Sequence, residues 1–413
     1  MAGKSLPESR LRQKLKLNEF KLNTLLEVTT SINNNVPTHE LFNLFKFILR
    51  NQLNIGKSIL YHKDEGSWKC VMRYGTRGQE KKFDVEQDLL HIKDITVIES
   101  SSKRHLSSFD VVIPVYHKNV ALAFLLLGDL DEQELRISSI IRHLNFIQTL
   151  ANIISVANEN KRLAKENLRQ ERAKRELEFA SEMQGLLFPE RLPDNEKIQV
   201  AARYQPHQQV GGDYYDYIPL NMDEFIFCMA DVSGKGVSAA LLMSNFQANL
   251  RAHIHYSHFS LTELVRELNH RVMATAKGEK FITLFIGKYN METRELSYVN
   301  AAHNHPIMQA GKETHYLDVG CTGLGMFRDL PFVNEGKIKV PENAVIVAYT
   351  DGVVEQENKD SEEYGMERLT ELVQGHPNDS MEELNTAILK SVDKFRGRVG
   401  PVDDITLVSL RIY

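Results

Sequence analysis

The sequence predicts an α+β protein whose C-terminal half is a layered core of strands and helices. From residue 194 onward, apolar runs of strand length alternate with longer stretches of helical periodicity. Aspartates stand beside glycine or at turns, at the edges of these apolar runs. Strands separated by helices and joined in part by hairpins, as at residues 290–294, are typical of a layered α+β domain.

The first predicted element is a helix over residues 8–32, within an N-terminal segment 1–36. Its stripe residues recur in alternating steps of four and three, with two polar interruptions. This narrow stripe favours pairing with a second copy, and the alternative is a helix packed on its own domain. The stripe consists of Leu11, Leu15, Asn18, Leu22, Leu25, Thr29 and Ile32.

Residues 37–157 are predicted to form a small α/β domain. An amphipathic helix over residues 40–53 precedes four strands, and a short turn at 117–119 suggests that the last two form a hairpin. The predicted strands cover residues 57–62, 68–74, 111–116 and 120–127. A second heptad stripe then runs through Ile140, Leu144, Ile147, Ala151 and Ile154.

One long helix is predicted over residues 131–187, and its part 158–187 is a charged linker. More than half of residues 158–178 are charged, with both signs mixed and neither Gly nor Pro, which indicates a solvated helix with salt bridges. We expect this helix to coil with a partner and to transmit a signal. The alternative is a rigid spacer with no regulatory role.

Residues 188–413 are predicted to form the largest domain, with no internal repeat. Its predicted strands cover residues 200–204, 225–230, 283–289, 295–300, 344–349 and 405–411. Its predicted helices cover residues 239–255, 261–276, 366–374 and 381–395.

Bulk composition excludes several classes of protein. The 413 residues, 42% hydrophobic and 25% charged, exceed one ordinary globular domain. A net charge of −5 gives no basic field for nucleic acid or an anionic membrane. The three cysteines, Cys70, Cys228 and Cys321, are far apart, which fits a reducing compartment, and we expect all three to be buried. The N-terminus has no apolar signal core and no segment reaches about eighteen apolar residues, so a cytoplasmic protein is expected.

Carboxylates at strand ends are the chemical signal of this sequence. They are Asp213 and Asp216 after Gly-Gly, Asp231 before Val-Ser-Gly-Lys-Gly, Asp351 before glycine, and the doublet Asp403-Asp404. Strand ends that converge on one edge of a β-core can gather such carboxylates, which cannot all stay ionised without cations. Oxygen ligands with no supporting Cys or His set favour Mg²⁺ or Mn²⁺ over zinc. The sequence therefore predicts a two-metal hydrolase.

Each aspartate motif is weak alone. Gly-Gly-Asp213 is more often a turn than a metal site, and Asp216 either reaches the same site or caps a turn. The carbonyl of Val232 can supply a further ligand beside Asp231. The Gly-Lys-Gly segment lacks the P-loop spacing, which argues against ATP binding. The joint occurrence of the motifs in this order is a strong signal.

Residues from about 180 to 413 resemble the SpoIIE/RsbU branch of the metal-dependent type 2C serine/threonine phosphatases (the PPM family). The matching segments are LFP at 187–189, YQP at 204–206, VGGDYYD, ADVSGKGVSAALLM, NAAHNHP at 300–306, YTDGVVE and DDITLV. The resemblance implies a β-sandwich flanked by helices that hydrolyses phosphoserine or phosphothreonine with a metal-activated water and two Mn²⁺ or Mg²⁺ ions. It also implies that Asp213, Asp231, Asp351 and Asp403 are catalytic metal ligands. Asp231 would bridge the ions, and the Val232 carbonyl and Asp404 would add to the ligand set.

The sequence departs from the family pattern at two places. No counterpart is evident for the arginine that holds substrate phosphate in eukaryotic members; Arg203 and Lys235 are candidates, each alternatively a surface charge. Ala302 replaces the glycine of the usual Asn-Ala-Gly-His, and a slight backbone change could follow because alanine adopts positive φ less easily. His303 either contacts substrate or is satisfied by structural hydrogen bonds.

Residues from about 20 to 157 resemble, less specifically, a GAF sensory domain for an unknown small ligand or protein, or a purely dimerising domain. The family resemblance implies a phosphorylated STAS-domain anti-anti-sigma factor as substrate, with the GAF-like domain and long helix acting through residues 177–192. A homodimer is expected, with neither nucleic acid nor membrane as partner. Two alternatives remain: a catalytically inactive scaffold on the same fold, and a metal-dependent nucleotidyl cyclase preceded by a GAF domain.

Overall fold

The computed structural model describes residues 6–64, 66–76, 78, 83–98, 106–128, 137–256 and 260–413. The chain forms two compact units, Met1–Glu171 and Arg172–Tyr413. The division between them falls inside one long helix, α4 (Ile137–Gly185), which is 49 residues long.

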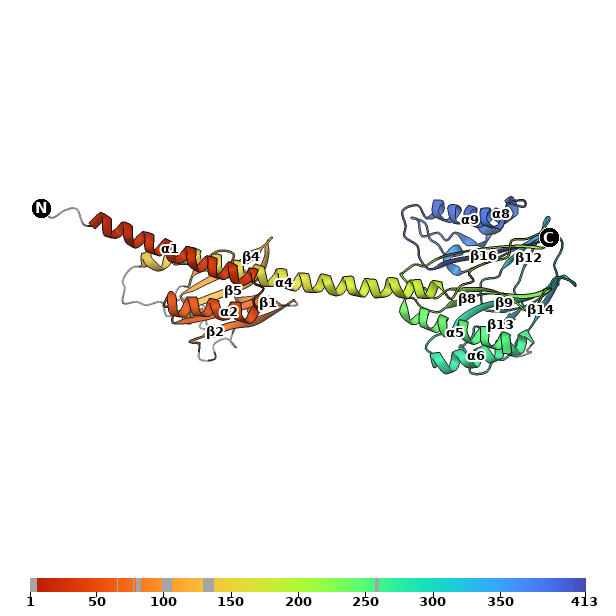
Figure 1. Cartoon of the computed structure of the whole chain (residues 1–413), viewed down its shortest axis with the longest axis horizontal. Coiled ribbons are helices and arrows are strands. Elements are labelled where there is room, and N and C mark those ends of the chain that lie inside the picture. Colours follow the sequence, from red (N-terminus) through yellow and green to blue (C-terminus); the bar gives the residue numbers. More distant parts are fainter. Residues whose placement is uncertain are drawn as a thin grey trace. The chain divides into compact units, whose positions relative to one another are not determined.

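The N-terminal unit is one antiparallel sheet covered by helices on one face (Figure 1). Apolar side chains of three helices, α1, α2 and α4, pack with this face, and α3 covers part of the other. The strands follow the order β2-β1-β5-β4-β3. The new elements are α1 (Leu6–Asn33), α2 (Thr38–Phe47) with a π-helical turn (Ile48–Gln52), α3 (Val85–Asp88), β1 (Lys57–Asp64), β2 (Ser67–Tyr74), β3 (Thr96–Val97), β4 (Val111–His117) and β5 (Val120–Gly128).

The predicted helices and strands of this unit are confirmed, including the hairpin that pairs His117 with Val120. The short elements α3 and β3 were not predicted. The expectation that every cysteine is buried is wrong for Cys70, which is exposed, whereas Cys228 and Cys321 are buried. Cys70 lies on β2, the edge strand of the sheet, and most side chains of this strand are not buried.

Helix α4 confirms a single long helix within residues 131–187, although residues 129–136 lie outside the described part of the chain. Its charged segment carries the expected ion pairs, with Arg162 bonded to Glu159 at 2.8 Å and to Glu166 at 3.0 Å. Such exposed pairs each stabilise a helix by only about 0.3–0.5 kcal/mol, so they support helicity without fixing tertiary structure.

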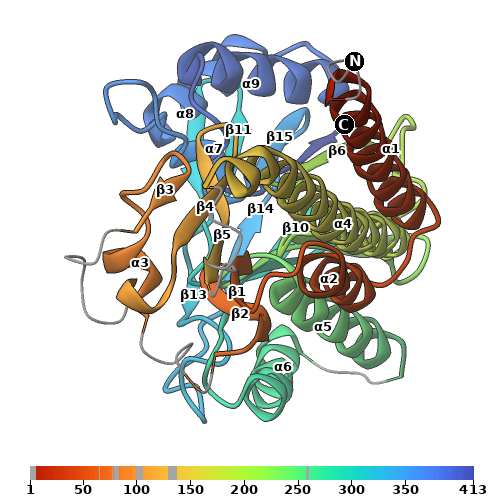
Figure 2. The same cartoon turned by 90° about the vertical axis from the view of Figure 1, so that its left-hand side faces the viewer.

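The C-terminal unit is a sandwich of two sheets between two helical layers. One sheet follows the order β13-β10-β9-β8-β7, with β14 also paired to β10, and the other follows β12-β11-β15-β16-β6. Helices α5 and α6 cover the first sheet, and α7, α8 and α9 cover the second, as Figures 1 and 2 show from two sides. A third apolar cluster fills the space between the sheets.

The elements of this unit match the predicted alternation of strands and helices. They are β6 (Ile198–Gln205), β7 (Tyr214–Pro219), β8 (Glu224–Val232), α5 (Val237–Tyr256), α6 (Leu261–Ala276), β9 (Ile282–Asn290), β10 (Glu295–Ala301), β11 (Ile307–Ala310), β12 (Glu313–Tyr316), β13 (Gly320–Cys321), β14 (Gly336–Lys339), β15 (Ala344–Tyr349), α7 (Asp351–Val354), α8 (Gly365–Gly375), α9 (Met381–Arg396) and β16 (Ile405–Ile412). Strands β7 and β11–β14 were not predicted, because they are short or interrupted by polar residues, Gly or Pro.

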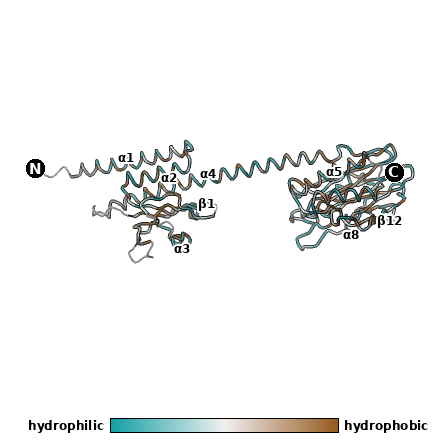
Figure 3. The backbone as a smooth tube through the Cα atoms, turned by 90° about the horizontal axis from the view of Figure 1, so that it is seen from below, coloured by the Kyte–Doolittle hydropathy of each residue, from teal (hydrophilic) through white to brown (hydrophobic). Residues whose placement is uncertain are grey.

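Local sequence explains where the main elements begin and why they are buried. Helices α6 and α9 both start at a capping box, Ser260 with Glu263 and Ser380 with Glu383. Every residue of β15 and β16 is buried because these strands are central in their sheet, and Figure 3 shows hydrophobic segments concentrated in this unit. Among the described residues, no helix is both long and apolar enough to cross a membrane.

Ala302, at the end of β10, has a φ of 54°. The alanine therefore remains in the left-handed region that glycine favours, at the turn before His303. We expect Ala302→Gly to raise the free energy of unfolding of this unit by about 0.5–1 kcal/mol. The left-handed strain of an L-residue, roughly 1–2 kcal/mol, exceeds the extra chain entropy that glycine loses.

Calorimetry of the full chain measures the stability of the C-terminal unit, whose thermal transition is identified as the one that Mn²⁺ shifts. Ala301→Gly is the matched control, because Ala301 is fully buried in β10 and has no positive φ. The control should destabilise the unit. Equal losses in both variants would contradict the strain at Ala302.

Candidate metal centre

The aspartates singled out in the sequence lie where strands of both sheets end. In the first sheet, β7 pairs with β8 so that Tyr214 faces Ala230, and the next residues, Asp213 and Asp231, therefore face each other. In the second sheet, Asp351 directly follows β15 and its capping residue Thr350, and Asp403 and Asp404 directly precede β16. Strand pairing thus brings the predicted carboxylates to one edge of the sandwich.

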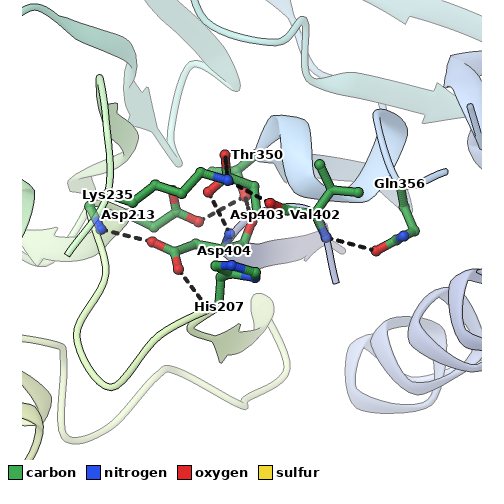
Figure 4. A network of polar contacts seen from close by, with 9 residues as sticks. His207, Asp213, Lys235, Thr350, Gln356, Val402, Asp403 and Asp404 are labelled. Carbon is green, nitrogen blue, oxygen red and sulfur yellow. Dashed lines mark hydrogen bonds and ion pairs between the residues drawn. The ribbon is translucent and has the colours of Figure 1, made fainter. Parts of the chain in front are cut away.

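Asp213 connects the two sheets. It is 1% exposed, and its Oδ2 accepts a hydrogen bond from Thr350 Oγ1 at 2.9 Å (Figure 4). The same oxygen also accepts a hydrogen bond from Thr406 Oγ1. Both threonines are fully buried; Thr406 lies in β16 of the second sheet, and Thr350 directly follows β15 of that sheet. They fix the Oδ2 atom of Asp213, and the carboxylate also makes a side-chain hydrogen bond with Asp231. Sequence reasoning missed both, although each stands within two residues of an aspartate motif.

Asp404 fixes the loop that leads to Asp213. Its Oδ1 accepts the backbone N–H of His207 at 2.6 Å, and its Oδ2 accepts that of Gly212 at 2.8 Å. A Cβ on Gly211 would lie 2.3 Å from Asp404 Oδ2, so this close approach requires glycine. Because both oxygens accept backbone N–H groups, the geometry favours an anchoring role for Asp404, and its assignment as a metal ligand stays a prediction.

Asp403 is paired with a cation of the chain itself. Lys235, between the two glycines that precede α5, places its Nζ 2.9 Å from Asp403 Oδ2 and donates to the carbonyl of Val402. Gln356 holds the same loop from the other side, since its side chain donates to the carbonyl of Gly400 at 3.2 Å and accepts from the N–H of Val402. Of the two candidates for holding substrate phosphate, Lys235 therefore lies at the acidic cluster. Its role in binding phosphate stays a prediction.

The electrostatics show an excess of negative charge at this edge. Burial and then the charge of Asp231 raise the pKa of Asp213 well above its usual value. Burial is the largest cause that raises the pKa of Asp231 to about 7, and the negative charges of Asp351 and Asp403 are the next. Burial and then the charge of Asp403 raise the pKa of Asp351 to about 6. Like charges that disfavour each other's ionisation in this way are relieved by bound cations.

The donor chemistry fits hard divalent ions. The predicted ligands all offer oxygen atoms, which Mg²⁺ and Mn²⁺ prefer. A Cβ on Gly212 would lie 2.9 Å from the Val232 carbonyl oxygen, so the Asp213 loop lies directly against that carbonyl. Within the described ranges, no three His, Cys, Asp or Glu side chains already form a metal-ligand set. The carboxylates are instead turned to hydroxyl, N–H and ammonium partners, and the ligand assignments of Asp213, Asp231, Val232, Asp351 and Asp403 stay predictions.

Three other candidates are bonded to residues other than the clustered aspartates. Asp216 neither reaches the site nor caps a turn, because alternate residues of β7 face opposite sides and its carboxylate binds Arg251 of α5 at 2.7 and 2.8 Å. Arg203 is paired with Glu382 of α9. His303 is 3% exposed, and burial lowers its pKa to about 3. Its Nδ1 is bonded to Thr283 at 2.9 Å, whereas its buried Nε2 has no hydrogen-bond partner among the described residues, so both interpretations of His303 stay predictions.

The last turn of α4 contacts the loop of Asp213 directly. The side-chain amide of Gln184, 7% exposed, donates to the carbonyl of Gly211 at 2.8 Å and accepts its N–H at 3.2 Å. Phe188, just after the helix, stacks on Tyr215 with ring centroids 4.9 Å apart. The helix end is thus bonded two residues from Asp213. The sequence analysis pointed to residues 177–192 but did not identify Gln184.

Comparison with known proteins agrees with this architecture. Residues 221–413 match the protein family described as Stage II sporulation protein E (SpoIIE). The chain is 28% identical over 246 residues to the phosphoserine phosphatase RsbU of Bacillus subtilis, covering 59% of this chain and 71% of that protein. A solved structure, the SiaA-PP2C domain of Pseudomonas aeruginosa, covers 59% of this chain and 99% of its own at a TM-score of 0.54 and 19% identity, which shows the PP2C fold.

A further relative extends toward the N-terminal unit. Protein IcfG of Synechocystis sp. is 26% identical over 330 residues, which is 72% of this chain and 51% of that protein. The chain thus spans about half the length of this relative.

The raised carboxyl pKa values predict a pH-dependent response to metal. Above about pH 4, Asp231 and Asp351 are ionised in the unfolded chain but still protonated in the native, metal-free unit. The metal-free unit should therefore lose stability as pH rises through about 4–7. Mn²⁺ removes this repulsion, so it should raise the unfolding temperature by on the order of 5 °C more at pH 7.5 than at pH 5.5.

Thermal unfolding with and without Mn²⁺ at the two pH values measures the difference. Asp231→Asn removes one of the repelling carboxylates and should reduce it. A Mn²⁺ effect that is equal at both pH values, or larger at pH 5.5, would show that these carboxylates are not what the ion neutralises.

Proposed function

Because the C-terminal unit carries a SpoIIE-type domain with the PP2C fold, we propose that this chain is a metal-dependent protein phosphatase acting on phosphoserine or phosphothreonine. The observation that carries the proposal is the convergence of Asp213, Asp231, Asp351 and Asp403 at one edge of the sandwich, where burial and mutual repulsion raise the pKa values of the first three. An acidic cluster of this kind has no use in a purely structural fold.

Each residue of the site would have a separate role in hydrolysis. Asp213 and Asp231, which face each other across β7 and β8, would hold Mn²⁺ or Mg²⁺ together with Asp351, Asp403 and the Val232 carbonyl. Two such ions, when bound, supply a water of lowered pKa and stabilise charge on the phosphoryl oxygens. The oxygen of a water would bond to phosphorus as the bond to the serine or threonine oxygen breaks, and that leaving oxygen would take up the proton that the water loses. Thr350 and Thr406 orient Asp213 for this task.

The catalytically inactive scaffold is the second candidate, and the structure disfavours it. A binding surface needs no arrangement in which two hydroxyls hold one buried carboxylate and a lysine neutralises another. Such groups cost stability unless they serve a ligand.

A phosphorylated STAS-domain anti-anti-sigma factor is the proposed substrate. Support comes from the SpoIIE/RsbU motifs of the sequence and from relatives named as phosphoserine phosphatases, RsbU and RsbP of Bacillus subtilis. RsbP is 25% identical over 224 residues, 53% of both chains.

The N-terminal unit is proposed to regulate this activity as a GAF-like sensor in a cytoplasmic homodimer. On α1, Leu11, Leu15 and Leu22 are 59%, 60% and 66% exposed, which fits pairing with a second copy. A signal would travel along α4 to Gln184, whose two hydrogen bonds hold Gly211 beside Asp213. A shift of the helix end would release this loop and so move one metal ligand.

The activity is tested with p-nitrophenyl phosphate and the full chain. We expect Mn²⁺-dependent hydrolysis that EDTA abolishes and that Asp231→Asn lowers by at least about 100-fold. Asp360→Asn, which changes a well-exposed carboxylate, is the control and should leave the rate unchanged. Activity that survives EDTA or Asp231→Asn would rule out the proposed mechanism.

The coupling through Gln184 is tested with Gln184→Ala. Loss of both hydrogen bonds should loosen the Asp213 loop, so that the Mn²⁺ concentration for half-maximal activity rises by roughly tenfold while kcat at saturating Mn²⁺ falls less. Glu182→Ala, two residues earlier and exposed, should match wild type. If both variants keep the wild-type Mn²⁺ dependence, the helix does not act through this contact.

A further inference from the structure

Three exposed apolar side chains lie on two adjacent segments near the acidic cluster. We call Phe281, Met326 and Phe327, which are 37%, 43% and 50% exposed, the apolar ridge. Large apolar groups at the surface are individually common, but neighbouring ones held in place mark an interaction surface. A Cβ on Gly325 would lie 3.5 Å from the Phe281 Cα, so the two segments that form the ridge are in contact.

Hydrogen bonds place the ridge close to Asp231. In the β8–β9 pair, Asp231 faces Thr283, and two residues further on the N–H of Ser233 donates to the carbonyl of Phe281 at 2.9 Å. The Phe281 N–H in turn donates to Ser233 Oγ at 2.9 Å. Ile282 and Leu324 then exchange two hydrogen bonds of 2.8 Å. Phe281 is therefore one strand spacing across and two residues along from Asp231, roughly 8 Å away, and the turn that carries Met326 and Phe327 begins one spacing further, at Leu324, roughly 10 Å away.

The turn that carries Met326 and Phe327 is rigid. The fully buried side chain of Asn269 on α6 accepts the N–H of Gly325 at 2.8 Å and donates to the carbonyls of Phe327 and Arg328 at 3.1 and 3.0 Å. Leu324 and Leu330 are buried at either end of this turn. A buried amide thus makes three hydrogen bonds to a turn in which Met326 and Phe327 are 43% and 50% exposed. Such preorganisation lowers the entropy cost of binding a partner.

We propose that the apolar ridge docks the folded phosphoprotein substrate, so that recognition depends on an apolar surface patch beside its phosphorylated residue. The inference rests on the proposed function. A folded protein whose phosphoserine or phosphothreonine reaches Asp231 covers about 800 Å² of this surface, a patch roughly 16 Å in radius, so Phe281 and the start of the turn that carries Met326 lie inside that footprint. Rigid aromatic and methionine side chains are the groups that carry binding energy at such interfaces.

The test compares three substrates of increasing size with the full chain. They are p-nitrophenyl phosphate, a ten-residue phosphoserine peptide from a STAS-domain protein, and that STAS-domain protein folded and phosphorylated on the same serine. Wild type should have a KM at least tenfold lower for the folded protein than for the peptide. The double variant Met326→Ser/Phe327→Ser should raise the KM for the folded protein at least tenfold and leave its kcat unchanged. For the two smaller substrates, both KM and kcat should match those of wild type.

Met222→Ser is the matched control. Met222 is 91% exposed and precedes β8 at the end opposite Asp231, about 25 Å away by the rise of the strand. It should match wild type on all three substrates. Phe327→Ala alone provides a second, milder variant with the same expected direction.

Several outcomes would overturn the docking proposal. Equal wild-type KM values for peptide and folded protein, or an unchanged KM in the ridge variants, would show that the ridge does not bind substrate. Equal losses on all three substrates would show that it supports the catalytic loops instead. A change of oligomeric state in sedimentation would make the ridge an interface between copies of this chain. Failure of wild type to hydrolyse p-nitrophenyl phosphate would instead refute the proposed phosphatase function itself.

Discussion

The crowding of carboxylates at one edge of the sandwich is the constraint on which the rest of the site depends. Asp213, Asp231, Asp351 and Asp403 repel one another in a partly buried place, and their neighbourhood offsets that repulsion. Two threonine hydroxyls bind Asp213, and an ammonium group binds Asp403. Each of these contacts joins one sheet or loop to another, so the geometry of the site and the closure of the sandwich edge stabilise each other.

The same loops connect the site to its surroundings in two directions. On one side, the chain before Asp213 is held by Asp404 and by Gln184 at the end of α4. On the other side, the chain after Asp231 is held to Phe281 through Ser233. A change at the helix end or at the apolar ridge would therefore reach Asp213 or Asp231, two of the proposed metal ligands, through hydrogen bonds made two residues away from each in the chain. Regulation and substrate recognition would act on the same edge from opposite flanks.

Several details show where local pattern misleads. Asp216 stands three residues after Asp213, yet the period of two along β7 directs it to Arg251 on the helical side of the sheet. Cys70 lies in a strand as expected, but at the sheet edge, where its side chain is exposed. Ala302 was expected to disturb a turn that favours glycine, and it instead adopts the left-handed conformation itself.

The order of the units, most helices and strands, and the aspartates that gather at one edge could all be predicted from the sequence, because apolar periodicity and glycine-flanked carboxylates are local signals. The groups that hold those aspartates became evident only from the packed sheets. Thr350 and Thr406 bond Asp213 across 137 and 193 residues of chain, and Gln184 reaches Gly211 across 27. Partners so distant leave no mark on local periodicity, since they meet only after two sheets have packed and brought their strand ends together.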